Sequence, residues 1–127
     1  MPPVIAKDTR ALERYQAEVA ANPQNPDAHA NLGWGYYGKG QLSEAIQAFQ
    51  QALALQADHL EAQYGLALAH RAASDKAAAA AAFEKARALA AQIEDKVRRQ
   101  MLTRLITGHL NALNTGDWNL GRHEVHA

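Results

Sequence analysis

Two consecutive segments of 34 residues decide the fold: PDAHANLGWGYYGKGQLSEAIQAFQQALALQADH at 26–59 and LEAQYGLALAHRAASDKAAAAAAFEKARALAAQI at 60–93. Apolar residues recur at the same place in both segments. The pairs include Leu32 and Leu66, Ala45 and Ala79, Phe49 and Phe83, Ala52 and Ala86, and Leu55 and Leu89. A fixed period of this length is typical of a solenoid built from helix-turn-helix units. Such chains usually bind other molecules and do not transform them.

The composition agrees with a single small helical domain. The chain has 127 residues, of which 48% are hydrophobic, with many alanines and with only 8 glycines and 4 prolines. Its formal net charge is zero, so nothing in it indicates nucleic-acid binding or an anionic membrane surface. The absence of cysteine excludes disulfides and thiolate chemistry. Without a leader pattern or an apolar run of membrane-spanning length, we expect a soluble, cytoplasmic protein.

Turn and capping signals divide the chain into helices. Asn25 and Pro26 predict a helix start, because proline tolerates the first helical position. Gly40 follows the expected end of that helix, and Asp58 with Glu61 three residues later predicts a capping box for the helix over 60–72. The remaining helices are expected from Asp8 or Thr9 to about Ala21, over 42–54, and from the alanine run at 77–82 to about Ala90.

The segment after Ala91 leaves one point open. A single helix could continue to about Leu113, or the chain could break near 92–95. Ile93, Val97, Met101, Leu105 and Leu110 keep helical phase, which predicts that the C-terminal helix buries a broad face and belongs to the fold. Residues 114–127 are expected to form a polar tail.

The repeated frame resembles the tetratricopeptide repeat family. The first unit matches the family pattern closely, and the second repeats it. The matching residues are Asn31-Leu32-Gly33, Tyr36-Tyr37, Gly40, Glu44-Ala45-Ile46, Phe49 and Ala52-Leu53, followed by Leu66-Ala67, Ala79, Phe83, Ala86 and Leu89. The family's early aromatic is replaced by His29 and Gln63, its second-unit tyrosine by His70, and its closing proline by Ala57 and Ala91.

The resemblance implies an all-α, short right-handed helix-turn-helix solenoid. It covers roughly residues 9 to 93. The expected organisation is an N-terminal arm (1–7), a half repeat (8–25), two repeats (26–59 and 60–93), a C-terminal helix (94–113) and the tail (114–127).

In tetratricopeptide proteins, the first helices of successive units line a concave groove that binds a partner. The resemblance places eight residues of this chain in that groove: Asp27, Ala30, Trp34, Tyr37, Glu61, Tyr64, Leu68 and Arg71. Aromatic residues with charges at their edge are typical of a peptide-binding hot spot. Some family members hold acidic C-terminal peptides in a carboxylate clamp, made by a lysine and an asparagine on one helix, an asparagine on the next, and a lysine and an arginine on a third. In this chain Ala30, Trp34, Gly65 and Asp95 occupy four of those positions, and only Arg99 fits. An apolar or helical segment of another protein is therefore the expected ligand.

A structural role is the alternative. Without a preceding first helix, the apolar N-terminal face formed by Leu12, Tyr15 and Val19 could associate with a second copy or a larger complex.

Enzymatic and metal-binding roles find little support. No nucleophile and base stand at motif spacing, and no phosphate-binding glycine loop is present, so we expect neither catalysis nor a cofactor. His123 and His126 have paired spacing but lack a third convincing ligand, so we predict no metal site. His29 and His70 replace packing aromatics and are expected to be partly buried with one hydrogen bond each.

Overall fold

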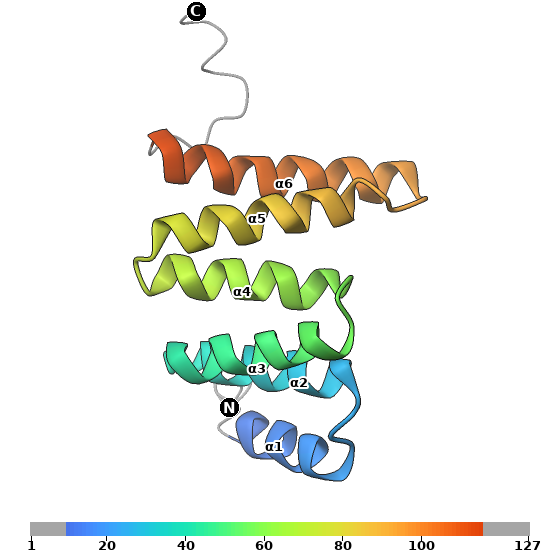
Figure 1. The fold of residues 1–127 in the computed structure, drawn as a ribbon, viewed down its shortest axis with the longest axis vertical. Helices are drawn as coiled ribbons and strands as arrows, with labels where there is room; N and C mark the ends of the chain where they lie inside the picture. The colour runs from blue at the N-terminus through green and yellow to red at the C-terminus, as the bar shows by residue number, and fades with distance from the viewer. Residues whose placement is uncertain (1–9, 116–127) are drawn as a thin grey trace, which may run out of the picture.

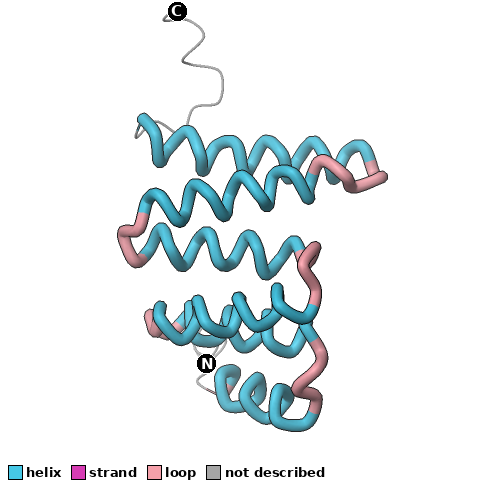
Figure 2. The backbone as a smooth tube through the Cα atoms, viewed as in Figure 1, coloured by secondary structure: helices cyan, strands magenta, loops and turns pink. Residues whose placement is uncertain are grey.

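The computed structural model describes residues 10–115, which form a stack of six α-helices (Figures 1 and 2). The described part of the chain contains no strand. The helices are α1 (Ala11–Ala21), α2 (Pro26–Gly38), α3 (Leu42–Leu55), α4 (Leu60–Ala72), α5 (Lys76–Ala90) and α6 (Lys96–Thr115). None of them has the length and apolarity needed to cross a membrane.

Each helix packs against the next one along the chain, and α2 also contacts α4. This is the arrangement expected of helix-turn-helix units, because the first helices of successive units become neighbours. Units 26–59 and 60–93 correspond to the pairs α2–α3 and α4–α5. The predicted all-α solenoid is thus confirmed.

Small residues allow the helices to approach closely. Ala45, Ala52, Ala79 and Ala86 are fully buried. The ring of Phe49 lies so near the backbones of α2 and α4 that a Cβ atom added at Gly33 would stand 2.7 Å from it, and one added at Gly65 would overlap it. The period in the sequence therefore marks the positions where backbones meet around an aromatic ring.

The helix ends follow the capping signals, with one correction. The Asn25 side chain accepts a hydrogen bond from the backbone N–H of Asp27, and Gly40 has the left-handed φ of 76°. The prediction that Asp58 caps α4 is wrong. The imidazole Nδ1 of His59 accepts the N–H of Ala62 at 3.1 Å, and Asp58 accepts from the side chain of Gln56. Asp58 stands one residue too early, because α4 begins at Leu60.

The question left open at 91–95 is resolved as a break. A turn follows Ala90, and the Arg99 guanidinium donates to the carbonyls of Ile93 and Glu94, at 2.8 and 3.3 Å. The Asp95 side chain accepts the N–H of Arg98 at the start of α6. These bonds stabilise the turn in which the chain reverses its direction.

The break also corrects part of the predicted buried stripe of the C-terminal helix. Val97 and Met101 are each 65% exposed, and Leu105 is 40% exposed. Leu110 is buried as predicted, together with Ile106. The sequence argument extended the phase of α5 through the turn, but once the chain reverses, only the residues that face α5 are buried.

Candidate partner-binding groove

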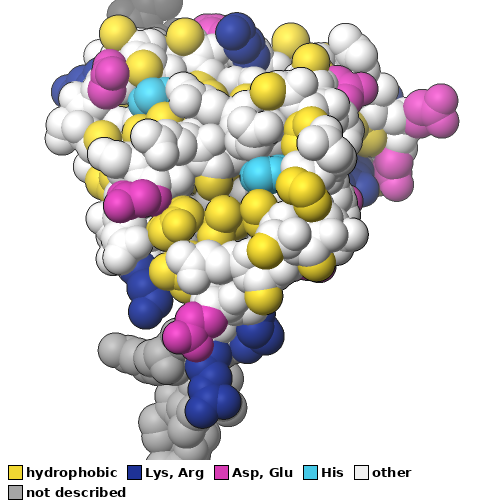
Figure 3. Space-filling model, turned by 60° about the horizontal axis from the view of Figure 1, so that its bottom comes forward, with side chains coloured by type: hydrophobic (Ala, Val, Ile, Leu, Met, Phe, Trp, Pro, Cys, Tyr) yellow, Lys and Arg dark blue, Asp and Glu magenta, His cyan; other side chains and the backbone are white. Residues whose placement is uncertain are grey.

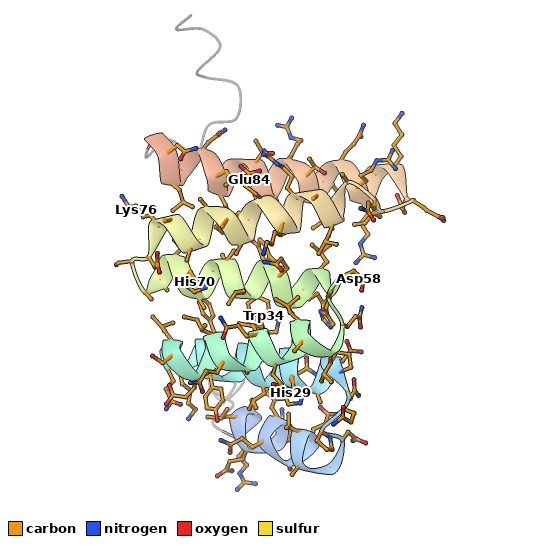
Figure 4. The ribbon with its side chains drawn as sticks, viewed as in Figure 1. His29, Trp34, Asp58, His70, Lys76 and Glu84 are labelled. Atoms are coloured by element: carbon orange, nitrogen blue, oxygen red, sulfur yellow. The ribbon has the colours of Figure 1, made fainter. Side chains whose placement is uncertain are left out.

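The open part of the predicted groove is an aromatic pair on α2. Trp34 and Tyr37 are both partly buried, and their rings meet edge to face with centroids 6.0 Å apart. The Trp34 ring also meets the buried Phe49 ring edge to face at 5.1 Å. Trp34 lies near the middle of the stack (Figure 4). Core contacts on one side and solvent on the other give this pair a fixed position from which it could contact a ligand.

Leu68 stands one period after Trp34, on α4, and is also partly buried. Because α2 and α4 are in contact, these equivalent positions belong to neighbouring helices. The structure thus provides two aromatic rings and a leucine from two adjacent first helices.

The other part of the predicted groove is tied to α6 through His109. The His109 Nε2 atom lies 2.7 Å from the Tyr64 hydroxyl, and its Nδ1 atom lies 2.9 Å from the Arg71 guanidinium. Because a guanidinium only donates, Nδ1 accepts and Nε2 carries the proton, which it donates to the Tyr64 oxygen. The imidazole also stacks on Phe83, with centroids 4.7 Å apart and an interplanar angle of 8°.

This arrangement requires a neutral imidazole. Burial, followed by the positive charge of Arg71, lowers the pKa of His109 to about 4. Burial also raises the pKa of Tyr64, an effect that the Arg71 charge opposes in part. Tyr64 and Arg71 are therefore both held by hydrogen bonds to a neutral imidazole.

The remaining predicted groove residues differ in exposure. Ala30 is buried and contributes almost no surface, whereas Glu61 is exposed. Asp27 is exposed, and its carboxylate lies 2.7 Å from the Nε2 of buried His59. Since His59 Nδ1 accepts the Ala62 N–H, its Nε2 carries the proton and donates to Asp27. This contact joins the start of α2 to the start of α4.

Sequence reasoning missed the roles of His59 and His109. His59 directly precedes an expected helix, so its position could have indicated a cap. No local signal indicates His109, since its partners Tyr64 and Arg71 lie 45 and 38 residues away in the sequence.

The other two histidines within residues 10–115 are His29 and His70. His29 is buried, with Nε2 2.8 Å from the carbonyl of Pro23, as expected, and His70 is partly buried. No group of three potential metal ligands occurs in the described residues. His123 and His126 lie outside them.

The predicted N-terminal face lies on α1, which packs against α2. Leu12, Tyr15 and Val19 are partly buried. Leu12 and Tyr15 approach α2 at Gly35, where an added Cβ atom would stand 2.8 Å from the Tyr15 ring. When the α1 end is turned toward the viewer, hydrophobic side chains gather in the middle of the visible face, and charged ones lie mostly at its margin (Figure 3).

Comparison with solved structures finds the same fold elsewhere. PcrH, solved in complex with the chaperone binding region of PopD, superposes with a TM-score of 0.79 at 20% sequence identity. The match covers 91% of this chain and 84% of PcrH. No curated protein matches the sequence.

The family comparison agrees with the repeat register. A tetratricopeptide repeat model matches residues 31–92, which begin within α2 and include α3, α4 and α5. This match coincides with the two helix-turn-helix units, so residues 31–92 are similar to tetratricopeptide repeats, and the whole stack has the same fold as PcrH.

Proposed function

We propose that this protein is a non-enzymatic interaction module, an adaptor, scaffold or assembly factor, that binds a peptide or helix of another protein in the groove of α2 and α4. The observation that carries the proposal is the partly buried aromatic pair Trp34 and Tyr37, in which the Trp34 ring also contacts Phe49. Rigid aromatic side chains lose little entropy on binding and dominate many interfaces.

The chemistry of the groove favours an apolar ligand. Leu68 extends the aromatic surface onto α4, and the exposed carboxylates of Asp27 and Glu61 lie near the helix starts. The five carboxylate-clamp positions offer one cation, Arg99, and its guanidinium already bonds two carbonyls of the 91–95 turn. An acidic C-terminal peptide would therefore find little to bind.

The family and the fold support binding of a protein partner. Tetratricopeptide repeats are protein-interaction modules, and PcrH was solved with a region of another protein. At 20% identity that likeness extends only to the fold, so the ligand of this chain has to be found by experiment.

The test compares two aromatic truncations on the same helix. Trp34→Ala removes the proposed anchor. Tyr36→Ala is the control, because the Tyr36 hydroxyl contacts Gln16 of α1. In a pull-down from the source cell, we expect wild type and Tyr36→Ala to retain the partner protein and Trp34→Ala to lose it. For an identified ligand, Trp34→Ala should weaken binding about 30-fold, equivalent to about 2 kcal/mol.

Trp34 fluorescence in a Trp118→Phe background gives an independent measurement, since these are the two tryptophans of the chain. The emission should change on titration with the ligand. Wild-type affinity in the Trp34→Ala protein would contradict the groove assignment.

A second candidate is a structural subunit that associates through Leu12, Tyr15 and Val19. The favouring observation is that all three are only partly buried, whereas Phe49 and Phe83 in the later units are fully buried. Light scattering separates the candidates: a dimer that Tyr15→Glu dissociates would support association, and a monomer at micromolar concentration would oppose it.

A further inference from the structure

The outer face of α6 corresponds to a surface that is covered in the earlier units. Val97 and Met101 follow Gln63 and Ala67 of α4 by one 34-residue period. Both α4 residues are buried, and Gln63 donates to the carbonyl of Ala82 on α5. One period before Ala67, Gly33 of α2 faces the Phe49 ring on α3. These positions are therefore the ones that a first helix turns toward the second helix of its own unit.

On α6 the same positions are open. Val97, Met101 and Leu105 stand four residues apart on one side of the helix, and all three are exposed. The opposite side of α6, with Ile106 and Leu110, is buried on α5. By position and packing, α6 is the first helix of a third unit, and its apolar outer stripe has no second helix against it within residues 10–115.

A depression runs beside this stripe. It has a volume of about 650 Å³ and is lined by Ala91, Arg99, Gln100, Thr103 and Arg104. Leu66 and Ala69, which stand one period before Gln100 and Thr103, are buried in α4. The depression on this side of α6 thus lies at positions whose equivalents in α4 are buried.

The charge around the stripe indicates the chemistry of the occupant. Residues 96–115 contain Lys96, Arg98, Arg99 and Arg104 and no acidic residue. At 100° per residue, Arg98 and Arg104 flank the line of Val97, Met101 and Leu105 on its two sides. A second α6 face would bring like charges together, whereas carboxylates at these edges would be attracted.

We infer that the outer face of α6 binds one amphipathic helix of a partner protein, with an apolar stripe flanked by acidic side chains, as the second helix of a third unit. The second helices of the existing units, α3 and α5, have 14 and 15 residues, so a partner helix of about four turns fits. This surface is distinct from the groove of Trp34 and Tyr37.

The probe is a labelled peptide with the sequence of α3, residues 42–55, because α3 already packs against a first helix. The substitutions Gln47→Lys and Gln51→Glu, on its outer side, allow a lactam bridge between the two side chains that keeps the peptide helical. The acidic peptide keeps Glu44 and carries Gln50→Glu. The basic peptide carries Glu44→Lys and Gln50→Lys and is otherwise identical.

Fluorescence anisotropy with the full chain should show saturable binding of the acidic peptide at least tenfold tighter than that of the basic one, and the difference should shrink in high salt. Met101→Lys should abolish binding without changing the melting temperature, because Met101 is 65% exposed. The double variant Arg98→Glu, Arg104→Glu should reverse the preference. Trp34→Ala should leave binding unchanged, which separates this surface from the groove.

Three results would overturn the inference. The first is that neither helical peptide binds. The second is equal binding of both peptides, or binding that Met101→Lys leaves intact. The third is a homodimer in sedimentation velocity that Met101→Lys dissociates, which would make a second copy the occupant.

Discussion

The aromatic residue of the second helix is fully buried in both units, but its neighbours differ. Phe49 lies against Gly33 and Gly65 and makes an edge-to-face contact with Trp34. Phe83 stacks on His109 and makes an edge-to-face contact with Tyr64. The first ring is therefore positioned mainly by the close approach of backbones, and the second partly by a polar network that depends on protonation. The same repeat pattern can thus give two cores, one sensitive mainly to packing and the other also to pH.

Removing the ring from the first unit should have the largest effect. Phe49→Ala should destabilise the protein by about 3–5 kcal/mol, because no flexible side chain stands at Gly33 or Gly65 to fill the cavity. Urea unfolding followed by circular dichroism measures the loss. A loss below about 1 kcal/mol would show that α2 and α4 move together to fill the cavity, contrary to the close contacts of Phe49 with Gly33 and Gly65.

Lowering the pH should destabilise the second unit. The pKa of His109 is lowered from 6.5 to about 4 in the folded protein. A lowered pKa means that the unfolded state binds the proton first. The contribution of neutral His109 is therefore complete above about pH 6.5 and is lost as the pH falls toward 4. At about 1.4 kcal/mol per pKa unit, this amounts to about 3 kcal/mol by pH 4.

The control for this pH effect is His109→Gln, which removes the titrating group. Unfolding free energies of wild type and variant, measured from pH 7.5 to 4, should differ most above pH 6.5 and converge on acidification. Parallel curves would contradict the lowered pKa and the neutral state of His109.

A single methyl group tests the contact between the two units. Gly65→Ala should destabilise by about 1–3 kcal/mol, since the new Cβ atom would overlap the Phe49 ring. Gly38→Ala is the matched control, because a Cβ atom there meets nothing within 4 Å. The control should be neutral or slightly stabilising, as alanine favours helices. Equal melting temperatures for the two variants would mean that Phe49 moves away at little cost.

The sequence predicted most of the first unit, because its determinants are local or periodic. Asn25, Gly33, Gly40 and Phe49 each have a role that follows from spacing and residue type. The same reasoning identified Trp34 and Tyr37 as groove candidates through the family resemblance, and their role in binding stays a prediction.

The C-terminal half was harder to predict, for a physical reason. The orientation of α6 depends on the turn at 91–95, which contains neither glycine nor proline and is held by Arg99 bonds to the carbonyls of Ile93 and Glu94. The 3.6-residue apolar phase continues through the turn and therefore cannot show such a reversal. The exposure of Met101 and the contact of His109 with α4 both follow from it.

The smallest predicted effect concerns the turns inside the two units. Gly40 and Ser74 stand one period apart, and both have a left-handed backbone, with φ of 76° and 66°. The hydrogen bonds also match, since each residue donates its N–H to a carbonyl three residues earlier.

The left-handed conformation strains serine by roughly 1–2 kcal/mol, whereas glycine adopts it freely but loses more chain entropy on folding, by about 0.4–1 kcal/mol. Ser74→Gly should therefore stabilise the protein by about 0.5 kcal/mol, and Gly40→Ser should destabilise it by a similar amount. Because the two turns are separate, urea midpoints for the double variant should return close to wild type. If Ser74→Gly instead lowered the midpoint, the serine side chain would have to stabilise its turn by more than the backbone strain, and the two turns would not be energetically equivalent.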